Sequence, residues 1–152
     1  GDLQYKGFNN NLIVRGNAVY GNLGASGALT TINNSSSAAS GYPNTTVAQN
    51  AVSYGGEAGY NIGSFFHSKA PRIYPFIRYE YYNPMEKTEA NTGLLADKRF
   101  QVSAVTAGLN YYALPNLVIK ADYTHRSIGG GKYNDENLVS VGIAYIGWFI
   151  KK

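Results

Sequence analysis

The sequence predicts an all-β fold, an antiparallel up-and-down β-barrel that crosses a membrane. Segments that alternate between polar and apolar residues recur along the chain, and the connections between them alternate between short and long. The composition agrees: the chain has 14 Tyr and 18 Gly, only 14% charged residues, and a mean hydropathy of −0.25. A barrel that is apolar outside and polar inside averages to such a value, and Tyr and Gly suit strands and tight turns.

Seven segments have the period-two alternation of strands. In the sharpest of them, Leu117, Ile119 and Tyr123 oppose Lys120 and Asp122. Six of the segments have about the ~9 to 11 residues that a tilted strand needs to cross a bilayer, and the first is shorter. The predicted strands are 3–8, 12–21, 51–62, 72–83, 100–113, 117–128 and 136–149.

The connections predict a direction for these strands. Bacterial outer-membrane barrels have short periplasmic turns and long external loops. The Ser-rich stretch 33–40 is expected to belong to one such loop. In the turn 114–116, we expect Ala113 to pair with Leu117 and Asn116 to be left-handed. The predicted short connections are 9–11, 63–71 and 114–116, and the predicted long ones are 22–50, 84–98 and 129–135.

Aromatic residues gather near both ends of the predicted strands. Such residues form two girdles at the headgroup levels of a membrane barrel, although core and edge aromatics of a soluble β-protein would give a similar pattern. The predicted periplasmic girdle comprises Tyr60, Phe65, Phe66, Tyr74, Tyr111, Tyr112, Trp148 and Phe149, and the predicted outer girdle comprises Tyr20, Tyr54, Tyr79, Tyr81, Tyr82 and Tyr123.

The second half of the chain resembles the phosphate-selective porin (porin O and P) type of outer-membrane protein. The resemblance lies in PFIRYEYYN at 75–83, AGLNYY at 107–112 and NLVIKADY at 116–123, followed by a last strand, and Glu57-Ala58-Gly59-Tyr60 is also similar. It implies that residues 1–152 are one segment, with about seven or eight strands, from the C-terminal part of a barrel of about sixteen strands. It further implies a Gram-negative outer-membrane location, a homo-oligomer that is a trimer in the full-length protein, and passive diffusion of small solutes, anionic ones among them.

Strand parity places nine polar residues on one face, where they would line a lumen. One interpretation is a channel wall whose basic groups lower the barrier for anions. The other is a set of ion pairs that solvates the interior of the barrel, since acidic residues nearly balance the basic ones. The predicted pore-lining residues are Arg15, Asn17, Glu57, Asn61, Arg78, Glu80, Lys120, Asp122 and Arg126.

The sequence offers no convincing catalytic set, cofactor motif or metal site, so we predict that the chain is not an enzyme. His67 and His125 have no second ligand at metal spacing. The stretch 129–132, Gly-Gly-Gly-Lys, lacks the first Gly and the final Ser or Thr of a phosphate loop. The net charge of +4 is scattered, which argues against a nucleic-acid partner and leaves outer-membrane lipid and small solutes as the expected partners.

Two other functional classes fit the same pattern of alternation. A small barrel of eight strands could anchor or display the loop 22–50 for adhesion, but seven predicted strands disagree with the even numbers of bacterial single-chain barrels. A soluble β-sandwich binding module would place its apolar face inside. In the barrel interpretation two sheet edges remain open, and we expect the folded chain to pair them by dimerising or by closing on itself.

Overall fold

The computed structural model of the chain describes residues 1–40, 46–66, 71–89 and 95–145. Seven strands form one antiparallel sheet in the order of the sequence. They are β1 (Asp2–Gly7), β2 (Leu12–Asn22), β3 (Asn50–Tyr60), β4 (Arg72–Lys87), β5 (Val102–Leu114), β6 (Leu117–Ile128) and β7 (Asp135–Tyr145). The prediction of an up-and-down antiparallel β fold is confirmed, and each strand agrees with a predicted segment. The last predicted strand, 136–149, runs into residues 146–149, which lie outside the described part.

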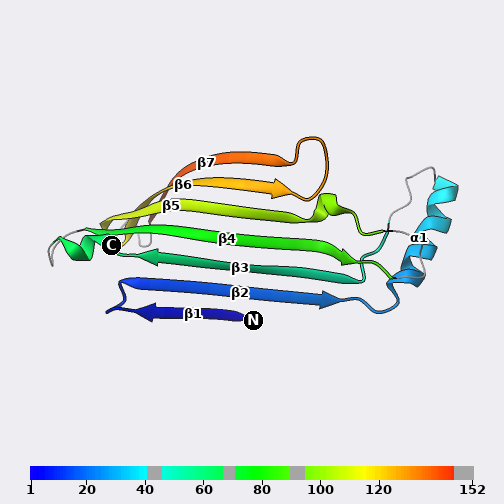
Figure 1. Cartoon of the computed structure of the whole chain (residues 1–152), viewed down its shortest axis with the longest axis horizontal. Coiled ribbons are helices and arrows are strands. Elements are labelled where there is room, and N and C mark those ends of the chain that lie inside the picture. The colour runs from blue at the N-terminus through cyan, green and yellow to red at the C-terminus, as the bar shows by residue number, and fades with distance from the viewer. Residues whose placement is uncertain (41–45, 67–70, 90–94, 146–152) are drawn as a thin grey trace, which may run out of the picture.

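The sheet is open. Its order runs from β1 to β7, and these two edge strands each pair with a single neighbour among the described residues (Figure 1). The expectation that the chain closes on itself is therefore wrong for the part that the structure describes. Two rows of backbone N–H and C=O groups are left available for pairing with another strand.

The connections lie at two opposite ends of the sheet, as the alternation of their lengths predicts. The end with β1–β2, β3–β4 and β5–β6 is called the short-turn end, and the end with the other three connections is called the long-loop end (Figure 1). The β1–β2 turn places Phe8, Asn9 and Asn10 in the left-handed region, with φ of 50°, 55° and 64°. Asn tolerates this conformation better than other non-glycine residues.

The β5–β6 turn differs from its prediction. Leu114 pairs with Leu117, the register shifts between Tyr112 and Leu114, and Asn116 does not have a positive φ. The loop is therefore a two-residue connection beside a β-bulge. The bulge absorbs one residue, so Tyr111 still pairs with Ile119 and the odd-numbered residues of both strands share one face, as predicted.

The predicted loop 22–50 contains a helix, α1 (Ser26–Ser40), which the sequence analysis did not foresee. The helix has no acidic residue in its first turn. A carboxylate from the β4–β5 connection takes that place: Glu89 accepts hydrogen bonds from the Gly27 amide at 2.5 Å and from the Ser26 hydroxyl at 3.2 Å. A negative charge stabilises a helix N-terminus, and this one is 62 residues away in sequence, which explains why local pattern does not reveal it.

The buried hydroxyl of Thr30 fixes α1 to the rest of the β2–β3 connection. Thr30 donates to the Ser26 carbonyl at 2.9 Å and accepts from the Val47 amide at 3.0 Å. Ser26 and Thr30 are almost completely buried. The predicted loop 84–98 is also shorter than expected, because β4 continues to Lys87, and a short 3-10 helix, η3 (Lys98–Phe100), precedes β5. A second one, η1 (Ile62–Phe65), lies in the β3–β4 connection.

We expect Glu89→Gln to loosen α1, because it removes the charge that caps the helix N-terminus but keeps the shape of the side chain. The cap is worth ~1 kcal/mol, which is about a fivefold rise in exchange for the amides of residues 27–35. Hydrogen exchange read by mass spectrometry measures the change. Glu86→Gln is the matched control, since Glu86 bonds to Asn83 and Tyr81 instead of α1. Equal exchange in the two variants would contradict the cap.

Candidate functional site

The strand register gives the sheet two chemically different faces. Residues paired across neighbouring strands share a face, and successive residues of a strand alternate between faces. The register aligns Arg15 with Glu57, Glu57 with Arg78, and Arg78 with Thr106. This polar face continues through the register-aligned residues Gln4, Thr124, Asp2, Asn17, Gly55, Glu80, Ala104, Arg126 and Glu136.

Glu57 stands at the centre of the polar face, between two arginines from neighbouring strands. Arg78 donates to its Oε2 from Nε at 2.9 Å and from Nη2 at 2.5 Å, and Arg15 donates to its Oε1 at 3.3 Å. The Glu57 side chain is 18% exposed, whereas those of Arg15 and Arg78 are 57% and 41% exposed. One carboxylate thus neutralises part of the positive charge of two guanidinium groups that would otherwise repel each other.

A hollow of about 470 Å³ lies over this cluster. Its wall has more acidic than basic side chains, since Asp2, Glu57 and Glu80 face only Arg15 and Arg78. Gln4 and Asn17 add neutral polar groups, and the backbones of Gly55 and Gly56 leave room. The hollow can hold water and small polar solutes.

The remaining predicted residues occupy other parts of the same face. Arg126 donates to Glu136 at 2.8 Å and to the Tyr82 hydroxyl at 3.1 Å, near the long-loop end. Lys120 aligns with Asn110, and Asp122 with Gly108, and in the part of the chain described here neither forms a hydrogen bond or an ion pair. Eight of the nine predicted residues therefore share the polar face.

Asn61 differs from the other eight. It follows β3 at the short-turn end and is 8% exposed. Its amide donates to Asn11 at 3.1 Å, and its side-chain oxygen accepts from the Ile73 amide at 3.1 Å. Asn61 therefore ties the β1–β2 turn to β4, which is a structural role.

Several residues of the polar face are not among the predicted pore-lining residues. Thr106 and Thr124 share a hydrogen bond of 2.8 Å between their hydroxyls. The Phe76 ring lies over Gly108, where an added Cβ would come within 2.6 Å of it. Register also turns Tyr74, Tyr82 and Tyr112 toward this face, so their assignment to the two girdles with the apolar-face aromatics is wrong. The sequence already indicates this face, because the three tyrosines have even numbers, as Arg78 and Glu80 do.

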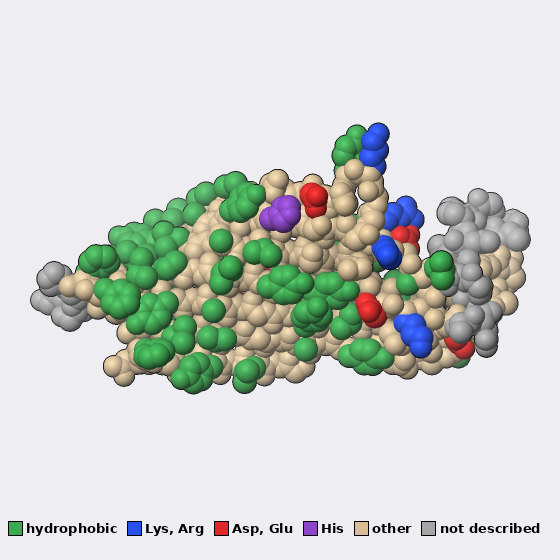
Figure 2. Space-filling model, in the orientation of Figure 1, with side chains coloured by type: hydrophobic (Ala, Val, Ile, Leu, Met, Phe, Trp, Pro, Cys, Tyr) green, Lys and Arg blue, Asp and Glu red, His purple; other side chains and the backbone are tan. Residues whose placement is uncertain are grey.

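The opposite face is apolar and exposed. On β7, Val139, Val141 and Ile143 are 73%, 76% and 72% exposed. Among the described residues, Val102 is the one buried apolar residue, with 4% of its surface exposed. Figure 2 shows this face, with apolar side chains spread across the strands. The face includes Leu3, Tyr5, Leu12, Val14, Tyr20, Val52, Tyr54, Tyr60, Ile77, Tyr79, Tyr81, Val105, Leu109, Tyr111, Ile119, Tyr123 and Tyr145.

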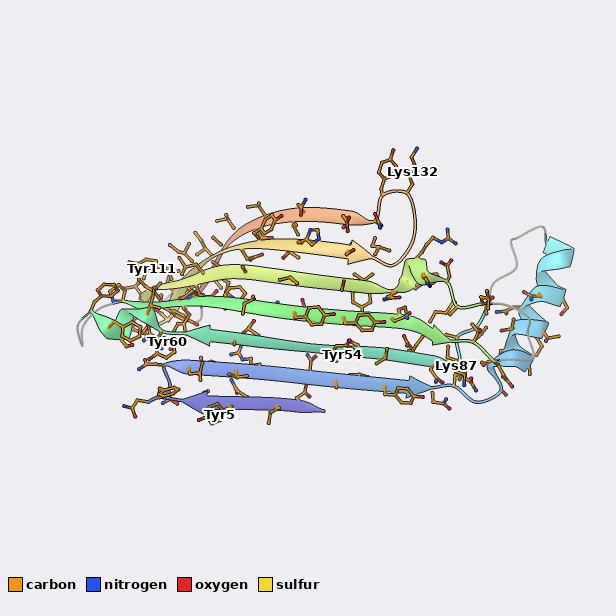
Figure 3. The ribbon with its side chains drawn as sticks, viewed as in Figure 1. Tyr5, Tyr54, Tyr60, Lys87, Tyr111 and Lys132 are labelled. Atoms are coloured by element: carbon orange, nitrogen blue, oxygen red, sulfur yellow. The ribbon has the colours of Figure 1, made fainter. Side chains whose placement is uncertain are left out.

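Aromatic pairs occur at two levels of the sheet. Tyr60 stacks on Phe65 with centroids 5.5 Å apart at the short-turn end, and Tyr54 stacks on Tyr81 at 4.9 Å nearer the long-loop end. Tyr60 and Tyr111 are labelled at the short-turn end in Figure 3, and Lys87 and Lys132 at the other. Of the residues predicted for the girdles, Trp148 and Phe149 lie outside the described residues.

The long-loop end carries a charged pair outside the sheet. Asp97 accepts from the Arg99 guanidinium at 2.6 and 2.8 Å and from the Arg99 amide at 2.9 Å. These bonds, the side-chain ones above all, hold the pKa of Asp97 below its usual range. The carboxylate therefore remains charged in mildly acidic solution and keeps η3 capped.

Comparisons of the chain with protein-family models, with curated proteins and with solved structures found no match. In the described ranges no three His, Asp or Glu side chains are grouped as a metal site would require, and no helix is long and apolar enough to span a membrane. The arrangement offers solvated, paired charges along a hollow.

We expect Glu57→Gln to destabilise the sheet, because two arginines then face each other without the carboxylate. For a partly exposed cluster the loss is ~1 to 2 kcal/mol in the free energy of unfolding. Urea titration in detergent micelles measures it. Glu80→Gln removes the same charge from β4, where Glu80 pairs with Gly55, two residues before Glu57. Glu80 forms no hydrogen bond or ion pair with the described residues. The unfolding free energy of Glu80→Gln should change by less than ~0.5 kcal/mol. A loss equal to that of Glu57→Gln would contradict the role of Glu57 between the two arginines.

Proposed function

We propose that this chain forms part of the wall of an outer-membrane, porin-type β-barrel, through which small solutes diffuse passively. The observation that carries the proposal is the exposed apolar face, which extends over every strand of a sheet whose described residues bury one apolar side chain. A soluble protein rarely leaves so large an apolar surface in water. Lipid tails are its natural cover, and they leave the opposite, polar face for the lumen.

Strand length supports this assignment. The strands β2, β3 and β7 have 11 residues, β6 has 12 and β5 has 13. An 11-residue strand tilted by 45° covers ~26 Å, close to the ~25 Å apolar band of such barrels. Soluble proteins use strands of ~5 to 6 residues most often.

The open edges of β1 and β7 fit the same proposal, provided that other strands complete the barrel. Lipid cannot satisfy unpaired backbone N–H and C=O groups, so a membrane-spanning sheet must close. The resemblance to phosphate-selective porins supplies a concrete form, a larger barrel that assembles as a trimer in the outer membrane. The lumen would then be lined by the polar face of this segment, from Arg15 on β2 to Arg126 on β6.

The proposal predicts ion conductance for the full-length protein in planar lipid bilayers. Arg78→Gln, on the polar face, should shift the ratio of K⁺ to Cl⁻ permeability by about twofold toward K⁺, since a lumen cation is lost. Ile77→Val is the matched control, because the neighbouring side chain belongs to the opposite face. Absence of conductance would refute the pore. A shift of equal size in the control would refute the assignment of the faces.

A charge on the apolar face should hinder folding into a bilayer. Ile77 lies midway along the apolar side chains of β4, between Ile73 and Tyr81. Ile77→Lys is expected to cost ~2 to 4 kcal/mol in phospholipid vesicles, the usual cost at the midplane. Denaturant titration of the protein folded in vesicles measures it. Ala104→Lys, whose side chain would lie beside Glu80 on the polar face, should cost less than ~1 kcal/mol. The reverse order would contradict the lipid-facing assignment.

A further inference from the structure

On each strand from β2 to β7, the apolar face ends at a polar residue on the side of the long-loop end. We call these residues the upper limit of the apolar face. Their position shifts in steps from strand to strand. The six residues are Asn22, Asn50, Asn83, Ser103, His125 and Asn137.

The register measures how far this limit moves. Asn22 pairs with Asn50, but Asn83 pairs with Val52, one step of two residues closer to the short-turn end. Ser103 pairs with Tyr81, which is two residues before Asn83. His125 in turn pairs with Val105, a third step of two residues, and it pairs on its other side with Asn137. The limit therefore moves by six residues over five strand-to-strand intervals.

The lower limit of the apolar face moves in the same direction. It lies at the paired residues Leu12 and Tyr60 on β2 and β3. On β4 it lies at Ile73, which aligns with Tyr111 and Ile119. On β6 it lies two residues further toward the short-turn end, at Leu117, which pairs with Leu114 and Tyr145. The apolar side chains thus form a band that is oblique to the strands, nine residues long on β2, β3 and β4 and seven residues long on β6.

We infer that this oblique band is the surface covered by the hydrocarbon core of a bilayer, and that the strands cross the membrane at ~40° to its normal; this inference rests on the proposed function. Six residues correspond to ~20 Å along the strands, and five intervals to ~24 Å across them. The angle whose tangent is that ratio is ~40°, within the range of ~35 to 45° found for outer-membrane barrels.

The height of the band gives an independent check. On β2, β3 and β4 it runs from Leu12 to Tyr20, from Val52 to Tyr60 and from Ile73 to Tyr81, nine residues in each case. Nine residues tilted by 40° rise ~23 Å, close to the ~25 Å apolar band of membrane barrels. On β6 the band runs from Leu117 to Tyr123, seven residues, which rise ~18 Å at the same tilt. A binding face for another protein would have no reason to follow such an oblique line. The headgroup level is then marked by Asn22, Asn50, Asn83, Ser103, His125 and Asn137.

Two positions distinguish tilted strands from strands that stand upright in the membrane. Both belong to one register row, a series of residues that pair from strand to strand across the sheet. Gly16 and Asn137 belong to the row that runs through Gly56, Tyr79, Val105 and His125. With upright strands the whole row lies at one depth. With a tilt of ~40°, Gly16 lies at the centre of the bilayer and Asn137 at the headgroups, ~15 Å higher.

The test uses the full-length protein in phosphatidylcholine vesicles, with single cysteines carrying a small fluorophore. The sequence has no native cysteine, and a Cβ at Gly16 would meet its nearest atom at an ordinary 3.7 Å. We expect the label of Gly16→Cys to be quenched at least about twofold more by lipids brominated near the chain ends than by lipids brominated near the headgroups, and the label of Asn137→Cys to show the reverse. Val14→Cys and Val139→Cys, which also share a register row, provide a second pair. Ser140→Cys, on the polar face of β7, should escape both lipids.

The outcomes separate the two proposals. Equal depths at positions 16 and 137, and again at 14 and 139, would overturn the tilt and leave the membrane location standing. A label at position 16 or 14 that neither lipid quenches, although the protein is folded, would overturn the proposed function and the tilt together. The deep and shallow pattern given above would support both.

Discussion

Everything else in this sheet depends on the register of its backbone hydrogen bonds. Because side chains alternate with a period of two, a slip of one residue between neighbouring strands would move a whole strand's polar residues to the apolar face. The register aligns Arg15, Glu57 and Arg78 in one line, and two salt bridges fix that line from the side chains as well. On the opposite face, the stacked rings of Tyr54 and Tyr81 lie in directly paired positions and reinforce the same alignment.

The sheet lacks the hydrophobic interior that usually stabilises a domain. Val102 aside, the apolar side chains of its described part remain at least partly accessible, so burial inside the chain supplies little of the free energy of folding. The stabilisation must come from what covers the apolar face and pairs the edges of β1 and β7. A bilayer and further strands provide both, which is why the fold and the proposed location support each other.

The sequence predicts the strands well, because alternation reports directly on the two faces of a sheet. It also predicts the order of short and long connections, and eight of the nine polar-face residues. It fails where the deciding contact is distant in the chain. The cap of α1 comes from Glu89, and the role of Asn61 depends on Asn11 and the amide of Ile73. Neither contact has a local signature.

Other misses arise from local geometry that composition does not encode. The bulge beside Leu114 replaces the expected left-handed Asn116 and yet preserves the parity of β5 and β6. An aromatic residue near a strand end suggests a membrane girdle, but its odd or even position in the strand decides which face it lies on. Tyr74, Tyr82 and Tyr112 have even numbers, as Arg78 does, and lie on the polar face. An interfacial aromatic must satisfy both conditions.

A tilt of the strands also changes which polar residues lie at one depth. Lys120 and Asp122 are two to four residues from the register line of Arg15, Glu57 and Arg78. In a sheet tilted by ~40° the midline of the apolar band descends toward β6, and all five charged residues then lie near the middle of the bilayer. Arg126 and Glu136, next to the Arg78 line in register, lie instead at the outer rim. Five charged residues would therefore act together on a passing solute: Arg15, Glu57, Arg78, Lys120 and Asp122. Their positive and negative charges nearly balance. Anion preference in such a wall would have to come from the spacing of its charges or from strands beyond this segment, since the net charge at this level is small.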